Sequence, residues 1–173
     1  MSGKVRLYWD ASVFIALIQN EVGRAETCAR LFSDAEAGRF QIFTSVLTIA
    51  ECSGGRAVAN MAERELHLLN EAIRGFMEHA CLTMIQVDRA IAEHAQSLQQ
   101  WGRRELGRRL PPTDAIHLAS AIRARASVLH TYDDDHLTPL DGKTPPHGNE
   151  PLSIRHPGWT GTLPLFPSES VGF

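Results

Sequence analysis

The fold is decided by the stretch VRLYWDASVFIALI, residues 5–18, in which a short apolar run ends at an acid and a second one begins. The run Val5–Trp9 has the length of a buried strand, and the run Val13–Ile18 fits a helix that packs on that strand. Asp10 stands between them. Its carboxylate is therefore expected at the rim of a sheet, beyond the carboxyl end of a strand, where parallel sheets hold their ligands.

The chain repeats this alternation of short apolar runs and amphipathic segments as far as about residue 155. Strands are predicted at Val5–Trp9, Phe40–Thr44, Leu82–Val87, Ser127–Thr131 and, at a sheet edge, Leu152–Arg155. Helices are predicted after Asp10, at Gly23–Gly38, from a Ser45 cap through Cys52, at Ala57–Ala80, at Ala90–Leu106 and after a Thr113 cap. This pattern favours an α/β domain with a parallel sheet and helices on both faces.

Composition limits the classes of protein that fit. A chain of 173 residues, 43% of them hydrophobic and 21% charged, is long enough for one domain with its own core. We assign residues 1–155 to that domain and residues 156–173 to a Pro- and Gly-rich tail. The net charge of −3 argues against indiscriminate binding of polyanions. No apolar run approaches the ~20 residues of a membrane span, so we expect a cytoplasmic protein with no membrane partner.

Four acids stand at the ends of apolar runs: Asp10, Glu51, Asp114 and Asp133. Taken singly, each has a structural explanation as a helix cap, a first-turn acid, a solvated helix residue or a turn residue. Together they favour a cluster at one edge of the sheet. Two carboxylates ~5 Å apart repel by roughly 3 kcal/mol at an effective dielectric of about 20. A divalent cation removes that conflict, and carboxylate oxygens suit Mg²⁺ or Mn²⁺, which support phosphodiester chemistry.

Other motifs give less. The chain contains no P-loop, GxSxG or HExxH motif, and its eight histidines show no ligand spacing. His117, one helical turn after Asp114, fits a packed core histidine better than a ligand. A basic cluster precedes that helix and consists of Arg103, Arg104, Arg108 and Arg109. Arginines of this kind either grip RNA phosphates or form a solvated helix end, and the sequence leaves both readings open.

With these motifs, the chain resembles the PIN-domain ribonucleases, and most closely the VapC-like toxins of type II toxin–antitoxin pairs. The resemblance covers about residues 5–140 and is carried by four segments: YWDASVFIAL (8–17), SVLTIAE (45–51), PTDAIHLASA (112–121) and VLHTYDDDHL (128–137). It implies a three-layer α/β/α sandwich with a central parallel sheet. It also implies an endoribonuclease that depends on Mg²⁺ or Mn²⁺.

The resemblance assigns roles residue by residue. It places metal ligands at Asp10, Asp114 and Asp133, a further catalytic acid at Glu51, and supporting hydroxyls at Ser12 and Thr131. The run Asp133-Asp134-Asp135 is richer in acids than the usual motif, so Asp135 is a further candidate ligand. The tail beyond about His156 exceeds the compact family domain, and the sequence assigns it no role.

The resemblance also implies partners: an RNA substrate, a cognate antitoxin protein and a second copy in a homodimer. The predicted helix Ala57–Ala80 carries Met61, Leu66, Leu69 and Ile73 at helical spacing. These side chains either serve such an interface or pack into the domain's own core. Two rival functions stay open: a PIN nuclease of RNA processing outside any toxin pair, and a PIN-like module that binds RNA or protein without cutting.

Overall fold

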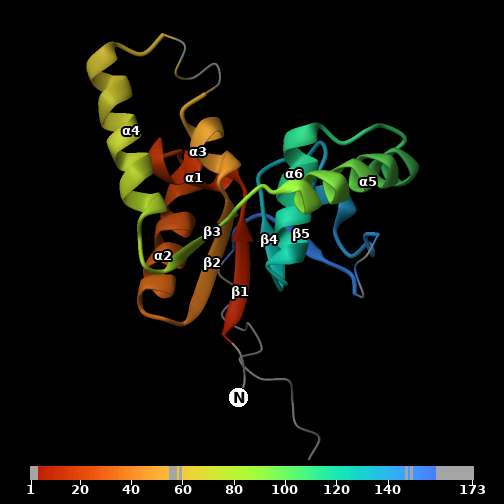
Figure 1. Cartoon of the computed structure of the whole chain (residues 1–173). Coiled ribbons are helices and arrows are strands. Elements are labelled where there is room, and N and C mark those ends of the chain that lie inside the picture. The colour runs from red at the N-terminus through yellow and green to blue at the C-terminus, as the bar shows by residue number, and fades with distance from the viewer. Residues whose placement is uncertain (1–3, 55–57, 59, 147, 149, 159–173) are drawn as a thin grey trace, which may run out of the picture.

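A five-stranded parallel sheet forms the centre of the computed structural model, which describes residues 4–54, 58, 60–146, 148 and 150–158 (Figure 1). The strand order is β3-β2-β1-β4-β5, and every neighbouring pair is parallel. The strands are β1 (Val5–Trp9), β2 (Phe40–Ser45), β3 (Leu82–Ile85), β4 (Val128–His130) and β5 (Ser153–Arg155). The predicted parallel sheet and its edge strand near residues 152–155 are confirmed.

Helices cover both faces of the sheet, so the predicted three-layer α/β/α sandwich is confirmed (Figure 1). The helices are α1 (Ala11–Ile18), α2 (Ala25–Glu36), α3 (Leu47–Cys52), α4 (Glu63–Met77), α5 (Arg89–Leu106) and α6 (Pro112–Arg123), and a short 3₁₀ helix spans Thr138–Leu140. Side chains of alternate β1 residues pack into two separate hydrophobic cores, one on each face of the sheet. Leu7 and Trp9 pack with α1, α2 and α4, whereas Tyr8 packs with α5 and α6.

The long helix predicted at 57–80 is shorter than expected, since it begins at Glu63 and ends at Met77. Its start is set by Ala62, which has an extended backbone and donates its N–H to the Glu65 carboxylate at 3.0 Å. This bond is one half of a capping box. Residues 55–57 and 59, where the predicted helix began, lie outside the described residues.

Most other boundaries differ from the predicted ones by one or two residues, and two of these differences have a clear structural cause. β3 ends at Ile85 instead of Val87, because its partner strand β2 ends at Ser45, the residue paired with Ile85. Thr113 does not cap α6: the helix begins one residue earlier, with Pro112 in its first turn. Ser45 does act at the start of α3, where its Oγ accepts the N–H of Leu47 at 3.1 Å.

The described residues contain no helix that is both long and apolar enough to cross a membrane. The three cysteines are free thiols; Cys28 and Cys52 are buried and Cys81 is partly buried. Of the predicted tail, only residues 156–158 lie within the described part of the chain. The division into a domain and a tail therefore stays a prediction.

Candidate active site

Asp10 is the most deeply fixed of the four acids. It follows the last residue of β1, caps α1 and is only 5% exposed. Its Oδ1 accepts hydrogen bonds from the Ser12 hydroxyl at 2.6 Å and from the Val13 N–H at 3.3 Å. Burial raises the pKa of Asp10 above its ordinary value, and these bonds oppose that rise because they favour the ionised form.

The hydroxyls of Ser12 and Thr131 join the ends of β1 and β4. Thr131 Oγ1 donates to Oδ2 of Asp10 at 2.5 Å and accepts the N–H of Asp133 at 2.9 Å. Ser12 Oγ, which donates to Asp10, accepts the N–H of Tyr132 at 2.8 Å. Both residues that the family resemblance named as supporting hydroxyls therefore contact Asp10 and hold the segment that carries Asp133.

Asp114, Asp133 and His136 bring three potential ligand atoms within 4.8 Å of one another. Nδ1 of His136 lies 3.5 Å from Oδ2 of Asp114 and 3.4 Å from Oδ2 of Asp133. Burial, and then the negative charge of Asp133, raise the pKa of Asp114 to about 7. One proton or one cation between the two carboxylates would relieve their repulsion.

A tight turn directs Asp133 toward this group. Its Oδ1 accepts the backbone N–H of Asp135 at 2.9 Å and that of His136 at 3.0 Å, which leaves Oδ2 facing His136. Asp135 itself is exposed and does not belong to the three-residue group. The structure thus brings Asp133 next to Asp114 and leaves the Asp135 side chain at the surface.

Glu51 approaches the site from α3 through a buried histidine. Its Oε2 lies 2.5 Å from Nε2 of His117, and Nδ1 of the same ring lies 2.9 Å from the hydroxyl of Tyr8. His117 also acts on the other acids, since its charge lowers the pKa of both Asp10 and Asp114. His117 is thus electrostatically coupled to three of the four acids.

The two histidines of the site were not predicted as functional residues. His117 is buried, as expected for a core histidine, but it also bonds Glu51. His136 was not among the predicted site residues; it lies three residues after Asp133, and its Nδ1 lies 3.4 Å from Oδ2 of that acid. The D-x-x-H spacing in the sequence was the available signal.

The basic cluster lies at the end of α5 and in the loop that follows. Arg103, Arg104, Arg108 and Arg109 are all exposed. The guanidinium of Arg108 donates to the backbone carbonyl of Asp135, so this end of the cluster lies beside the turn that carries Asp133. Arg108 is therefore the member of the cluster that the structure connects to the turn carrying Asp133.

The matching family model is that of the PIN domain, which covers residues 7–139. That range contains all four acids, both supporting hydroxyls and His136. No curated protein matches the chain.

Several solved structures share the fold. VapC20 of Mycobacterium tuberculosis, a toxin that cleaves the sarcin–ricin loop, has 20% identity and a TM-score of 0.57 over 75% of this chain and 92% of its own. VapBC2 of Rickettsia felis, bound to a promoter DNA fragment, has 15% identity and a TM-score of 0.57 over 88% and 98%. FitAcB of Neisseria gonorrhoeae has 14% identity and a TM-score of 0.59 over 87% and 97%. At these identities the likeness concerns the fold.

Proposed function

This chain belongs to the PIN domain family, and on that premise we propose that it is a metal-dependent endoribonuclease that hydrolyses RNA in the cytoplasm. The observation that carries the proposal is the convergence of Asp114 and Asp133 beside His136, with Asp10 held at the neighbouring strand end. A metal-dependent ribonuclease of this family would explain why Asp114 and Asp133 lie together although burial and their mutual repulsion raise the pKa of Asp114.

The donor set fits a divalent cation. Burial, and then the charge of Asp133, raise the pKa of Asp114 to about 7 despite the nearby His136, so a cation beside the two carboxylates would stabilise their ionised forms. Carboxylate oxygens are the ligands that Mg²⁺ and Mn²⁺ prefer, and the His136 imidazole adds one nitrogen. We assign Asp10, Asp114 and Asp133 as the carboxylates that hold the ion, with His136 as an additional ligand.

When bound, such an ion supplies a Lewis acid that activates water and stabilises the charge developing on a phosphate. The protein's own residues would do the rest. In this proposal Glu51, which contacts His117, would orient the attacking water and accept its proton. Ser12 and Thr131 donate hydrogen bonds that orient the Asp10 carboxylate and favour its ionised form. The exposed Arg108 and Arg109 would bind phosphates on either side of the scissile bond.

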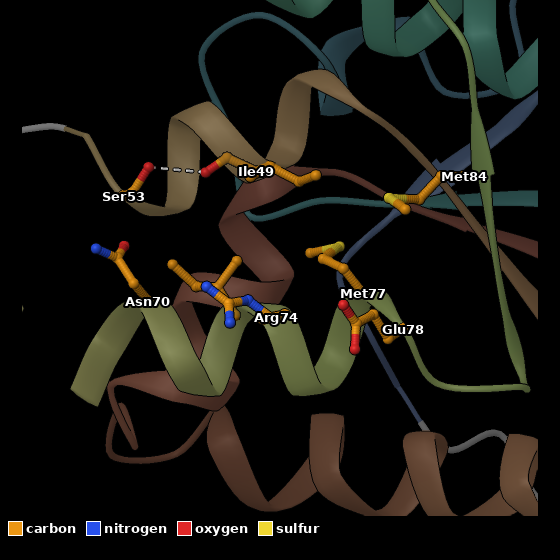
Figure 2. Close-up of a pocket in the computed structure, with 8 residues that line it drawn as sticks. Ile49, Ser53, Asn70, Arg74, Met77, Glu78 and Met84 are labelled. Carbon is orange, nitrogen blue, oxygen red and sulfur yellow. Dashed lines mark hydrogen bonds between the residues drawn. The ribbon is translucent and has the colours of Figure 1, made fainter. Parts of the chain in front are cut away.

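We further propose that the protein is the toxin of a toxin–antitoxin pair. The support is the fold shared with VapBC and FitAcB structures, together with a cavity of about 390 Å³ between α3 and α4. Figure 2 shows Asn70, Arg74 and Met77 of α4 on one side of it and Ile49 of α3 on the other. A segment of an antitoxin lying in this cavity would run along the helix that carries Glu51.

The apolar residues of α4 divide between core and cavity. Leu69 and Ile73 are buried, whereas Leu66 and Met61, which precedes the helix, are partly buried and pack against the same core. Ile73 also lines the cavity. The side chains that remain for a partner are therefore different ones: Ile49 at 42% exposed and Leu68 at 60%. A homodimer that uses this face stays part of the proposal.

Incubating the purified protein with total RNA tests the ribonuclease function. Cleavage is expected with Mn²⁺ or Mg²⁺ and should stop when EDTA removes the ion. Cleavage that continues in EDTA would contradict metal dependence, and intact RNA under all metal conditions would contradict the ribonuclease itself. Growth arrest on expression, relieved by co-expression of the neighbouring reading frame, tests the toxin role.

A further inference from the structure

We propose that His117 is a positioning residue for Glu51, holding the acid's carboxylate in the pocket through its Nε2–H. The inference rests on the ribonuclease function proposed above and adds to it a residue whose part in the reaction is indirect. Three observations carry it: the bond to Glu51, the bond to Tyr8 that fixes the ring, and the position of His117 on α6.

The hydrogen-bond partners of His117 indicate which of its two ring nitrogens faces Glu51 and carries a proton. Nε2 lies 2.5 Å from Oε2 of Glu51, and an ionised carboxylate can only accept, so Nε2 is the donor. Nδ1 lies 2.9 Å from the hydroxyl of Tyr8. Burial raises the pKa of Tyr8 well above its ordinary value, so its hydroxyl keeps its proton and can donate to Nδ1. The bond to Glu51 persists whether the imidazole is neutral or charged.

The ring has little freedom to move. His117 is 2% exposed, and Tyr8, which lies 5.9 Å from it between ring centroids in an edge contact, is fully buried. Tyr8 belongs to β1, directly before Trp9 and Asp10. The imidazole is thus held against β1, the strand that precedes Asp10. Its hydrogen bond to Glu51 restrains the carboxylate of that residue.

Glu51 needs such a support. It is the penultimate residue of α3, a helix of only six residues, and its side chain is 25% exposed. A glutamate in that place has several rotatable bonds and access to solvent. His117 provides the one hydrogen bond recorded for the Glu51 carboxylate in the described part of the chain.

His117 also lies on the same side of α6 as Asp114. The two residues are three positions apart in the helix and are therefore neighbours on its surface. One face of α6 thereby carries the candidate metal ligand Asp114 and, one turn later, His117, which contacts Glu51. A histidine that only filled space would need neither the bond to Glu51 nor this register.

Two substitutions of His117 separate positioning from packing. The amide nitrogen of His117→Gln reaches the place of Nε2 and can still donate to Glu51, whereas that of His117→Asn reaches only the place of Nδ1. We expect His117→Gln to keep kcat for RNA cleavage near the wild-type value. We expect His117→Asn to lower kcat by about 10–100-fold, the usual effect of losing a supporting hydrogen bond at a metal site. KM should change little in both.

The buried His130 of β4 provides the matched control, because its Nδ1 has no hydrogen-bond partner among the residues that the structure describes. His130→Gln and His130→Asn should give equal kcat values, since no bond distinguishes the two amides there. Equal kcat values for folded His117→Gln and His117→Asn would overturn the proposal and leave His117 as a packing residue.

NMR of the imidazole tests the inference without RNA cleavage. The Nε2–H signal of His117 should exchange slowly with solvent in the wild type and rapidly in Glu51→Ala. Unchanged exchange in Glu51→Ala would overturn the proposed bond. If the wild-type protein cuts no RNA, the proposed ribonuclease function fails, and this exchange measurement alone decides whether His117 positions Glu51.

Discussion

The hydroxyl of Thr131 donates a hydrogen bond to Oδ2 of Asp10 at 2.5 Å, although the two residues lie 121 positions apart in the chain. The bond links the ends of β1 and β4, which are neighbours in the sheet. It favours the ionised form of a carboxylate whose burial raises its pKa. The affinity of Asp10 for a cation should therefore depend on Thr131, which is distant in the sequence but in contact with Asp10 in the fold.

Thr131→Val should raise the pKa of Asp10 further, because the mutation removes a hydrogen bond to the charged form. A protonated carboxyl is a poor ligand, so the pH at which Mn²⁺ binding reaches half its maximum should move upward. Calorimetric titration of Mn²⁺ at several pH values measures this. Thr131→Ser keeps the hydroxyl and should match the wild type, and an unshifted profile for Thr131→Val would disprove the link.

The stability of the metal-free protein should depend on pH through Asp114. The folded pKa of about 7 lies above the ordinary value of 3.8, so the folded state binds the proton more tightly between these values. The free energy of unfolding should therefore increase as the pH falls from about 7 toward about 4. In EDTA, Asp114→Asn should flatten this part of the curve and melt at a higher temperature than the wild type at pH 8. If the free energy of unfolding of Asp114→Asn depends on pH as steeply as that of the wild type, the raised pKa of Asp114 is contradicted.

His136 should contribute to metal affinity. His136→Ala removes the nitrogen that lies 3.4–3.5 Å from both carboxylates and should weaken Mn²⁺ binding by about tenfold, in the range found for partners of metal ligands. A thermal shift series in Mn²⁺ measures the change, since a ligand of the folded state raises the melting temperature. The exposed His67 of α4 gives a control, His67→Ala. Identical midpoints for the two variants would exclude His136 as a ligand.

The basic cluster should act on RNA affinity through charge. Replacing Arg108 and Arg109 by Gln should weaken RNA binding and reduce the slope of log K against log salt by about 1.4, at roughly 0.7 for each lost contact to a single strand. Binding is measured in an Asp10→Asn background so that the RNA stays intact. Arg30→Gln with Arg64→Gln, on exposed sites of α2 and α4, is the matched control. Equal slopes for the two pairs would assign the cluster to a solvated helix end.

The cavity between α3 and α4 should govern antitoxin binding. Ile49→Glu places a charge on the exposed side chain that lines it and should weaken the complex with the antitoxin by tenfold or more, about 1.4 kcal/mol. Copurification and calorimetry with the product of the neighbouring reading frame measure this. Val22→Glu, another exposed apolar site, should leave the affinity unchanged. Unaltered affinity of Ile49→Glu would place the antitoxin elsewhere.

Much of the fold could be predicted from the sequence, because short apolar runs and amphipathic segments alternate along the chain. The position of Asp10 at the carboxyl end of β1 could be predicted, since it follows a short apolar run of strand length. The start of α4 could not, because the extended Ala62 is held by the Glu65 side chain and its residue type favours helix.

The site's histidines were harder to predict for a different reason. His136 reaches Asp133 through a turn made by backbone bonds to the Asp133 carboxylate, and a strand-and-helix pattern does not describe such a turn. His117 lies on a nearly apolar helix, so its burial was predictable. Its bond to Glu51 depends on where α3 lies relative to α6, which the pattern of either helix alone leaves open.

These acids are proposed to form the metal centre of a ribonuclease. The most direct test is the rate at which Asp10→Asn and Asp114→Asn cleave total RNA in Mn²⁺. Both variants should remain folded by circular dichroism and should cleave RNA more slowly than the wild type by orders of magnitude. Wild-type cleavage rates in both variants would contradict the claim and move the active site elsewhere.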